Sequence, residues 1–116
     1  MAQLEFVEPH FKKIDVRNVQ CGENVIIVQP VNLYECSIGN NSFIGPFTEI
    51  QKGVVIGDNC KIQSHTFICE LVTIGDNCFI GHGAMFINDA MTDGSPSGGD
   101  KTKWKNAIPF FYNCTQ

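Results

Sequence analysis

Residues 38–80 read IGNNSFIGPFTEIQKGVVIGDNCKIQSHTFICELVTIGDNCFI, and this stretch carries an isoleucine at every sixth position. These anchors begin at Ile38 and end at Ile80, and Phe86 takes the next place. The fourth residue after each anchor is small or β-branched, from Ser42 through Ala90. A hexapeptide repeat therefore runs through the middle of the chain.

A step of six residues cannot keep these isoleucines on one face of an α-helix. With 3.6 residues per turn, six residues advance the chain by about 240°, so the side chains would scatter over three stripes. Gly, Asn and Asp recur too often for one long strand. Short strands joined by tight turns satisfy both constraints.

Three hexads also make a longer period. At a spacing of eighteen residues, the segments 38–41, 56–59 and 74–77 align as IGNN, IGDN and IGDN. We therefore predict an all-β fold, a parallel β-helix of triangular section, with the last Asn of each segment in a left-handed turn. The isoleucines would stack into a continuous core along its axis.

The hexad divides the chain into three parts: an N-terminal lead-in or cap at 1–20, the β-helix of about four coils at 21–91, and a loop and C-terminal tail at 92–116. We expect the lead-in to cover the first open coil. In that coil Cys21, Ile27 and Leu33 would point inward, and the coil comes out one residue short before Ile38.

The C-terminal part lacks the repeat. The sequence TDGSPSGGDKTK begins at Thr92 and contains turn formers and charges without an apolar anchor, which indicates a protruding loop, either disordered or used for binding. The aromatic segment 104–112 would fold over the last coil as a lid, or would be the remnant of a longer repeat.

Composition excludes several classes of protein. The chain has 116 residues and a formal net charge of −4, so it fits one domain and offers no basic stripe for nucleic acid. No segment reads as a secretion signal or is long enough to insert into a membrane. Six cysteines occur without a C-x-x-C pair, and Cys60 and Cys78 fall at inward positions of the repeat. We expect a reduced, cytoplasmic protein.

Two histidines are the first candidates for chemistry. His65 and His82 lie seventeen residues apart, so neighbouring coils should bring them to the same edge of the prism. His82 stands between Gly81 and Gly83, which would let a ligand or another backbone approach. The plainer interpretation is two solvated or hydrogen-bonded rings at turns.

Polar residues at the end of the last coil are the second candidates. Asn88 and Asp89 follow the bulky Phe86 just before the loop, and Glu70 lies one coil away from this position. Asn-Asp also forms turns well, and Glu70 fits a simple surface charge. A metal site is not expected, because zinc needs three or four ligands and His10 is far from the other two histidines in the repeat.

The segments IGPFTEIQKGVVIGDNCKIQSHTFICE and IGDNCFIGHGAMFIND closely resemble the hexapeptide-repeat acyltransferases, in particular those that N-acetylate nucleotide-linked 3-amino sugars. The hexad identifies only the superfamily, whereas QSHTFIC and GHGAMFIND are more specific. The resemblance covers about residues 20–90. It implies a left-handed parallel β-helix that assembles as a homotrimer, with active sites between subunits.

The same resemblance implies a reaction and roles for the candidates. Acetyl-coenzyme A would donate an acetyl group to the 3-amino group of a dTDP- or UDP-linked sugar made for surface polysaccharide such as lipopolysaccharide. Catalytic parts fall to Asn88, which would orient the amine or thioester, and to His65. Substrate contacts fall to four residues: His82, Asp89, Phe86 and Glu70.

One departure from the family leaves alternatives open. Family members usually continue with further coils that form much of the coenzyme A groove, whereas nothing after Thr92 repeats here. The donor groove would then come from segment 104–112 or from a partner. A non-catalytic sugar-nucleotide-binding or structural trimer is the second interpretation. A γ-carbonic-anhydrase-like metal trimer, which would require zinc, is the third.

Overall fold

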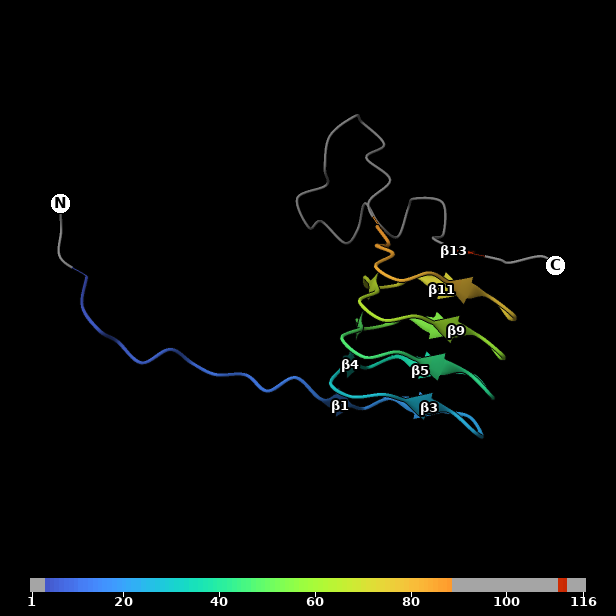
Figure 1. Ribbon diagram of the computed structural model, residues 1–116, viewed down its shortest axis with the longest axis horizontal. Coiled ribbons are helices and arrows are strands. Elements are labelled where there is room, and N and C mark those ends of the chain that lie inside the picture. The colour runs from blue at the N-terminus through green and yellow to red at the C-terminus, as the bar shows by residue number, and fades with distance from the viewer. Residues whose placement is uncertain (1–3, 89–110, 113–116) are drawn as a thin grey trace, which may run out of the picture.

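The chain forms a β-solenoid of about four turns, consistent with a left-handed parallel β-helix (Figure 1). The structure is a computed structural model, and it describes residues 4–88 and 111–112. Within these residues all regular structure is β-strand, as the hexad predicts. No helix in this part of the chain has the length and hydropathy needed to span a bilayer.

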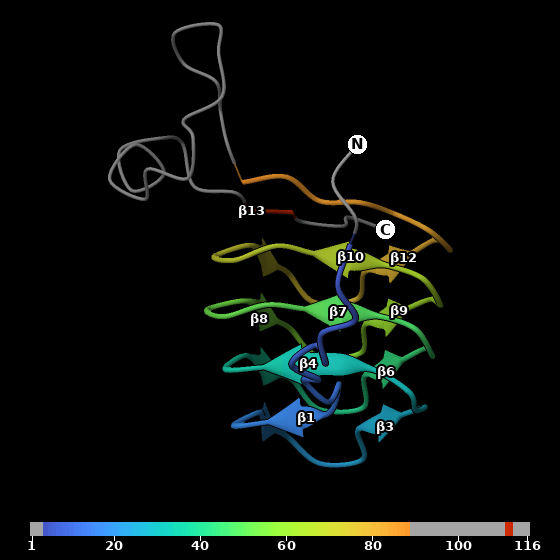
Figure 2. The same ribbon diagram turned by 90° about the vertical axis from the view of Figure 1, so that its left-hand side faces the viewer.

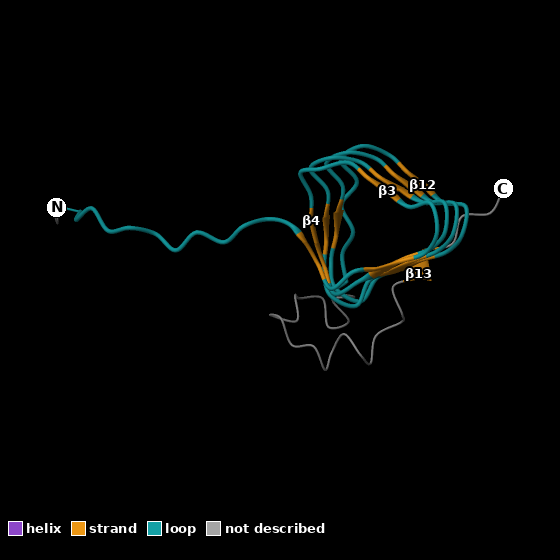
Figure 3. Cartoon of the chain, turned by 90° about the horizontal axis from the view of Figure 1, so that it is seen from below, coloured by secondary structure: helices purple, strands orange, loops and turns teal. Residues whose placement is uncertain are grey.

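In the described part of the chain, thirteen short strands build three parallel sheets, one on each side of a triangular prism (Figure 3). Sheet A holds β1 (Val16–Arg17), β4 (Asn32–Tyr34), β7 (Glu49–Ile50) and β10 (Phe67–Ile68). Sheet B holds β2 (Gln20–Cys21), β5 (Ser37–Ile38), β8 (Val55–Ile56), β11 (Thr73–Ile74) and β13 (Phe111–Tyr112). Sheet C holds β3 (Ile26–Ile27), β6 (Phe43–Ile44), β9 (Lys61–Ile62) and β12 (Phe79–Ile80).

The register of the strands stacks the anchors exactly as the repeat requires. Ile38 pairs with Ile56, and Ile56 with Ile74, which is the eighteen-residue period. From Ile38 to Ile74 the anchors are buried, and Ile80 is half-buried because it belongs to the last coil. The inward columns predicted from the sequence are confirmed.

The small positions of the hexad fill the corners of this core. Cys60 and Cys78 are buried as predicted, as are the hydroxyl residues at equivalent positions. Ser42 donates a hydrogen bond to the backbone carbonyl of Gly57, and Thr48 donates to that of Gly45. Buried hydroxyls are thus satisfied by the carbonyls of the turns.

Each coil turns at three corners where the backbone adopts positive φ. The Asn corner joins sheets B and C, and its positive-φ residues are Asn24, Asn41, Asn59 and Asn77. The His corner joins sheets C and A, with Pro30, Phe47, His65 and Gly83 at equivalent positions, the last three at positive φ. The Glu corner joins sheets A and B and holds Asn18, Glu35, Gly53 and Leu71. Left-handed asparagines at the repeated turns are confirmed.

The missing residue of the first full coil is located at the Glu corner. Leu33 pairs with Ile50, seventeen residues on, whereas Ile38 pairs with Ile56, eighteen residues on. The chain between Leu33 and Ile38 is therefore one residue shorter than between Ile50 and Ile56. Of the three inward residues predicted there, Leu33 is buried and Ile27 half-buried, but Cys21 is exposed because no coil lies beneath it.

The N-terminal part differs from the expected cap. β1 pairs in parallel with β4, with Val16 opposite Leu33, so the first coil begins inside the segment 1–20. Residues 4–13 run away from the prism and do not cover its first coil (Figures 1 and 3), whereas the carbonyl of Asp15 accepts a hydrogen bond from the NH of Leu33. Phe6 and Phe11 are almost fully exposed along this arm.

The C-terminal tail contributes one strand to the stack. β13 pairs in parallel with β11, with Phe111 opposite Thr73 and Tyr112 opposite Ile74. The tail therefore returns to sheet B as the next strand of the stack, although its sequence shows no hexad. The hexad does not predict this strand, because thirty-eight residues, instead of eighteen, separate Thr73 from Phe111. The loop expected at 92–103, and the aromatic segment up to residue 110, lie outside the described residues.

Candidate functional site

The His corner brings the two candidate histidines onto adjacent coils. His65 adopts a φ of 63°, and its backbone NH donates to the carbonyl of Pro46 on the coil below. His82 precedes Gly83, whose φ is 74° and whose NH donates to the carbonyl of Ser64. Both histidine side chains are exposed, at the edge between sheets A and C that Figure 2 shows beside β10 and β12.

His65 packs against an aromatic ring of the coil below. Its ring centroid lies 5.0 Å from that of Phe47, and the two planes are inclined by 29°. Phe47 is itself 58% exposed, so the stacked pair forms a two-ring surface at the corner. Stacking fixes the plane of the imidazole.

His82 contacts a different residue, Ser64. The Oγ of Ser64 lies 3.0 Å from Nδ1 of His82, within hydrogen-bonding distance. The two residues are eighteen apart, so they occupy the same place on successive coils. One nitrogen of the His82 ring is thus engaged by the scaffold, and the side chain as a whole remains exposed.

The glycines that flank His82 have open space around them within the described part of the chain. A Cβ built on Gly81 or on Gly83 meets no atom within 4 Å. By contrast, a Cβ on Gly45, at the same corner two coils below, would come within 2.7 Å of the backbone N of Ser64. The upper end of the His corner can therefore admit another molecule beside His82.

The second candidate pair lies at the Glu corner. The side-chain amide of Asn88 donates a 2.9 Å hydrogen bond to the backbone carbonyl of Glu70, so Glu70 lies one coil below Asn88, as the sequence predicts. Asn88 is only 9% exposed, and Glu70 is half-buried. The observed contact of the Asn88 amide ties the end of the last coil to the coil beneath it.

Phe86 and Asp89 complete the predicted set. Phe86 is buried in the core, above the column of isoleucines, and its backbone NH donates to the carbonyl of Phe67. The thiol of Cys69 donates in turn to the carbonyl of Phe86. Phe86 is thus part of the packed interior of the last coil. Asp89 lies outside the described residues.

The side of the prism that carries sheet A separates the two candidate pairs. His65 and His82 lie at one end of β10, and Glu70 and Asn88 lie at the other (Figure 2). The structure brings each pair together across neighbouring coils, and it leaves the two pairs at different corners of the prism.

Sheet A also carries a polar network that the sequence reading missed. The carboxylate of Glu49 accepts hydrogen bonds from the side-chain amides of Asn32, at 3.1 Å, and Gln51, at 2.8 Å. Arg17 donates to the Asn32 side chain and lies over the ring of Tyr34, 5.1 Å from its centroid. Burial, followed by the charges of Glu49 and other nearby groups, raises the pKa of Tyr34.

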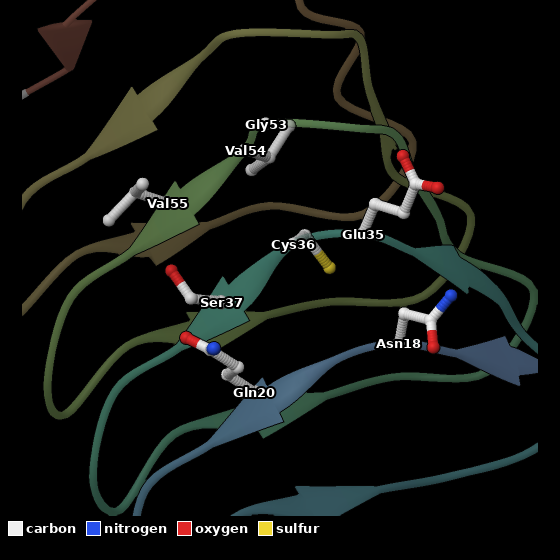
Figure 4. A pocket seen from close by; sticks show the side chains of 8 residues that line it. All are labelled: Asn18, Gln20, Glu35, Cys36, Ser37, Gly53, Val54 and Val55. Carbon is white, nitrogen blue, oxygen red and sulfur yellow. The ribbon is translucent and has the colours of Figure 1, made fainter.

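A cavity of about 310 Å³ lies away from these candidates, beside the Glu corner of the lower coils (Figure 4). It occurs where the shorter corner at Glu35 meets the longer corner at Gly53, whose NH donates to the Glu35 carbonyl. This change in corner length leaves a hollow without a cluster of reactive side chains. Its lining consists of Asn18, Gln20, Glu35, Cys36, Ser37, Gly53, Val54 and Val55.

Metal and thiol chemistry have little support in the described residues. Across residues 4–88, His, Cys, Asp and Glu form no group of three that could hold a metal ion. Of the five cysteines in this part of the chain, Cys21 is exposed and the other four are buried. Burial, with a smaller contribution from Cys21, raises the pKa of Cys36 to about 11, so this thiol is a poor nucleophile near neutral pH.

Ser64 and Phe47 are the residues that sequence reasoning overlooked. The signal was present, because both lie eighteen residues before a candidate histidine: Ser64 before His82 and Phe47 before His65. A coil of seventeen residues would pair the two histidines with each other. The coils here have eighteen residues, so His82 lies over Ser64 and His65 lies over Phe47.

Comparison with protein families agrees with the repeat and adds a function class. The model described as Bacterial transferase hexapeptide (six repeats) matches residues 35–70, and the model described as Hexapeptide repeat of succinyl-transferase matches residues 71–87. Both matches are to hexapeptide-repeat transferases. The matched hexapeptide-repeat domains contain Ser64 and both candidate histidines, and they suggest acyltransferase-type activity. Comparison with curated proteins gives no match.

Proposed function

We propose that this protein is a cytoplasmic N-acetyltransferase that moves an acetyl group from acetyl-coenzyme A to the 3-amino group of a dTDP- or UDP-linked amino sugar. The observation that carries the proposal is the His corner, where an exposed histidine with open space beside it stands on a solenoid matched by transferase models. The sugar and the acetyl group rest on the resemblance of the segments around His65 and His82.

The proposed reaction needs no covalent bond between the protein and its substrates. The neutral amine attacks the thioester carbonyl, a C–N bond forms, and the C–S bond breaks as the coenzyme A thiolate leaves. The nitrogen gives up one proton and the leaving sulfur takes up one, so amide and free thiol are the products. A histidine can carry this proton, since a free imidazole has a pKa of about 6.5.

A homotrimer would complete the site. The His corner and Asn88 lie at different corners of one protomer, so a substrate that contacts both within one chain would have to cross the side that carries sheet A. Two corners from neighbouring protomers could instead face each other across a cleft. In such a cleft Asn88 would contribute to orientation of the amine or of the thioester, and Glu70 and Asp89 would lie near the sugar.

The descriptions of the two matched families differ in the acyl group. One of the two matched families is described by succinyl transfer and the other carries no acyl group in its description. The test is release of coenzyme A thiol from acetyl- and succinyl-coenzyme A in the presence of a dTDP-3-amino sugar. Faster release from acetyl-coenzyme A supports the proposal, whereas preference for the succinyl donor would correct the acyl group.

A non-catalytic nucleotide-sugar-binding trimer is the second candidate. The observation that favours it is the hydrogen bond between the Asn88 amide and the Glu70 carbonyl. This bond explains Asn88 as a residue that stabilises the last coil, without a catalytic role. Titration calorimetry separates the two functions. Binding of a nucleotide sugar without binding of any acyl-coenzyme A would support the binding protein and exclude the enzyme.

A further inference from the structure

We propose that Ser64 is a positioning residue that holds the proton of the neutral His82 ring on Nδ1, so that Nε2 is the base of the reaction. This inference rests on the proposed acyl transfer. It selects His82 over His65 as the base and adds a residue, Ser64, to which no role has been assigned. The interaction that carries it is the 3.0 Å contact between Ser64 Oγ and His82 Nδ1.

The backbone makes this contact a fixed feature of the corner. The NH of Gly83, the residue after His82, donates to the carbonyl of Ser64 at 3.0 Å. A backbone hydrogen bond therefore joins the two coils next to the side-chain contact. Ser64 is half-buried, and its coil is packed above and below by others. The His82 ring is therefore held by the scaffold through Nδ1, and Nε2 is its remaining polar atom.

The space around the His82 ring is consistent with Nε2 acting as the base. Gly81 and Gly83 flank His82, and a Cβ on either would meet no described atom within 4 Å. Gly83 adopts a φ of 74°, a conformation that Phe47 and His65 share on the coils below, whereas Gly81 shows no such positive φ. The absence of a side chain at Gly81 leaves room for a substrate amine to approach the ring.

The direction of the hydrogen bond follows from the proton transfer. A serine hydroxyl can accept as well as donate, so Nδ1–H can donate to Oγ while Nε2 stays unprotonated. When Nε2 takes the proton from the attacking amine, Nδ1–H still donates to Oγ, and the bond strengthens because its donor is now charged. Nε2 then returns the proton to the leaving thiolate. Ser64 needs no rearrangement in this cycle.

His65 is less suited to the same task. Its ring lies on Phe47, and stacking sets the plane of an imidazole without choosing which nitrogen holds the proton. The His65–Phe47 surface fits a second role, namely contact with a planar or apolar part of a substrate. The two histidines thus differ in their partners, although both are exposed at one corner.

The first arm of the test is a direct reading of the tautomer. Long-range ¹H–¹⁵N correlation spectra of the full chain at alkaline pH show which nitrogen of each neutral ring carries the proton. The chain has only three histidines, and His82→Gln assigns the signal. We expect the Nδ1–H form in the parent protein and a shift toward the Nε2–H form in Ser64→Ala. An Nε2–H ring in the parent, or no change in Ser64→Ala, would overturn the proposal.

The second arm is kinetic, with Ser64→Thr as the matched control. Ser64→Ala should lower kcat about tenfold, as expected for loss of a hydrogen bond to a group that becomes charged, with KM for both substrates little changed. Ser64→Thr keeps the hydroxyl and should retain most of the activity. Equal kcat in Ser64→Ala and the parent would refute the positioning role.

The two arms also separate this inference from the proposed function. If the parent protein releases no thiol with any acyl donor, the proposed function fails, while the tautomer spectrum still decides whether Ser64 positions the ring. If the parent is active and Ser64→Ala keeps both its activity and its Nδ1–H tautomer, acyl transfer stands and the role of Ser64 is excluded.

Discussion

The Asn corner and the His corner carry out the same turn in different ways. At the Asn corner each coil uses asparagine at positive φ, and side-chain oxygens of one coil accept from backbone NH groups of the coil below: Asp76 from Asp58, Asp58 from Asn40, and Asn40 from Glu23. At the His corner the equivalent positions hold Pro30, Phe47, His65 and Gly83. The backbone geometry is shared by the upper coils, but the chemistry of the side chains is not.

The comparison of the two corners distinguishes residues that serve the fold of a repeat protein from residues that serve its function. A residue that recurs on every coil has a structural role that every coil needs, such as forming a left-handed turn or pairing with a backbone donor. A residue that changes from coil to coil has a role specific to its own coil. The His corner places its histidines on the two upper coils, and His82 stands between two glycines with open space beside them.

The largest effect is expected in the core that both corners enclose. Ile62 is fully buried in the column of anchors, so Ile62→Asp places an unpaired charge in a continuous apolar interior. The free energy of unfolding should fall by about 4 kcal/mol or more, a large part of the roughly 5–15 kcal/mol that stabilises a typical domain. Thermal melting followed by circular dichroism measures it.

The matched control for this change is the neighbouring residue. Lys61 lies in the same strand and is exposed, so Lys61→Asp should leave the melting temperature within a few degrees of the parent. An unchanged melting temperature in Ile62→Asp would contradict the inward column.

The next effect compares glycines at the two corners. A Cβ on Gly57, near the Asn corner, would meet the side chain of Asp76 and would come within 2.8 Å of its backbone N. Gly57→Ala should therefore destabilise the fold by about 1–3 kcal/mol, because the stacked coils must move apart. Gly81→Ala, at the His corner, should leave the melting temperature unchanged. Equal destabilisation by both substitutions would show that the space at Gly81 is filled.

A smaller effect is expected where the last coil is tied down. Asn88→Ala removes the hydrogen bond to the Glu70 carbonyl and should cost about 1 kcal/mol of stability without unfolding the coil. If Asn88 also orients a substrate, turnover at low temperature should fall by more than this loss of stability explains. Loss of stability with full specific activity would assign Asn88 to the fold alone.

The smallest effect concerns the cysteines. Only thiolates react with iodoacetamide, and burial holds the pKa of Cys36 near 11, so this thiol should stay unlabelled at neutral pH. Its folded-state pKa lies above the usual thiol value of 9.0, so its contribution to stability is complete below pH 9.0 and is lost as pH rises toward 11. Mass spectrometry should find Cys21, which is exposed, labelled before Cys36. Early labelling of Cys36 would contradict its burial.

Most of the solenoid could be predicted from the sequence because the repeat is strict. Ile38 to Ile80 fix the columns, and the eighteen-residue period fixes which residues stack. β1 and β13 could not be predicted, because neither follows the hexad and each is placed by pairing with another strand of the stack, β1 with β4 and β13 with β11.

The candidate site was predictable only in part, for a related reason. The histidines and Asn88 stand out as unrepeated residues, but their partners depend on the exact coil length. At seventeen residues His82 meets His65, and at eighteen it meets Ser64, and only the latter pairing agrees with the upper coils. The corner that separates Asn88 from the histidines likewise follows from the three-sided coil, which puts residues six apart on different corners.

The most direct test of the contrast between the two corners is thiol release from acetyl-coenzyme A, with a dTDP-3-amino sugar as acceptor, by two variants of the same coil. His82→Ala changes an exposed residue of the His corner, and it should lose about 10²–10⁴-fold in turnover with an unchanged melting temperature. Asn77→Ala changes a residue at a φ of 60° in the Asn corner, and it should lose stability but keep its turnover at low temperature. Full activity in His82→Ala, or selective loss of activity in Asn77→Ala, would contradict the assignment of function to the His corner.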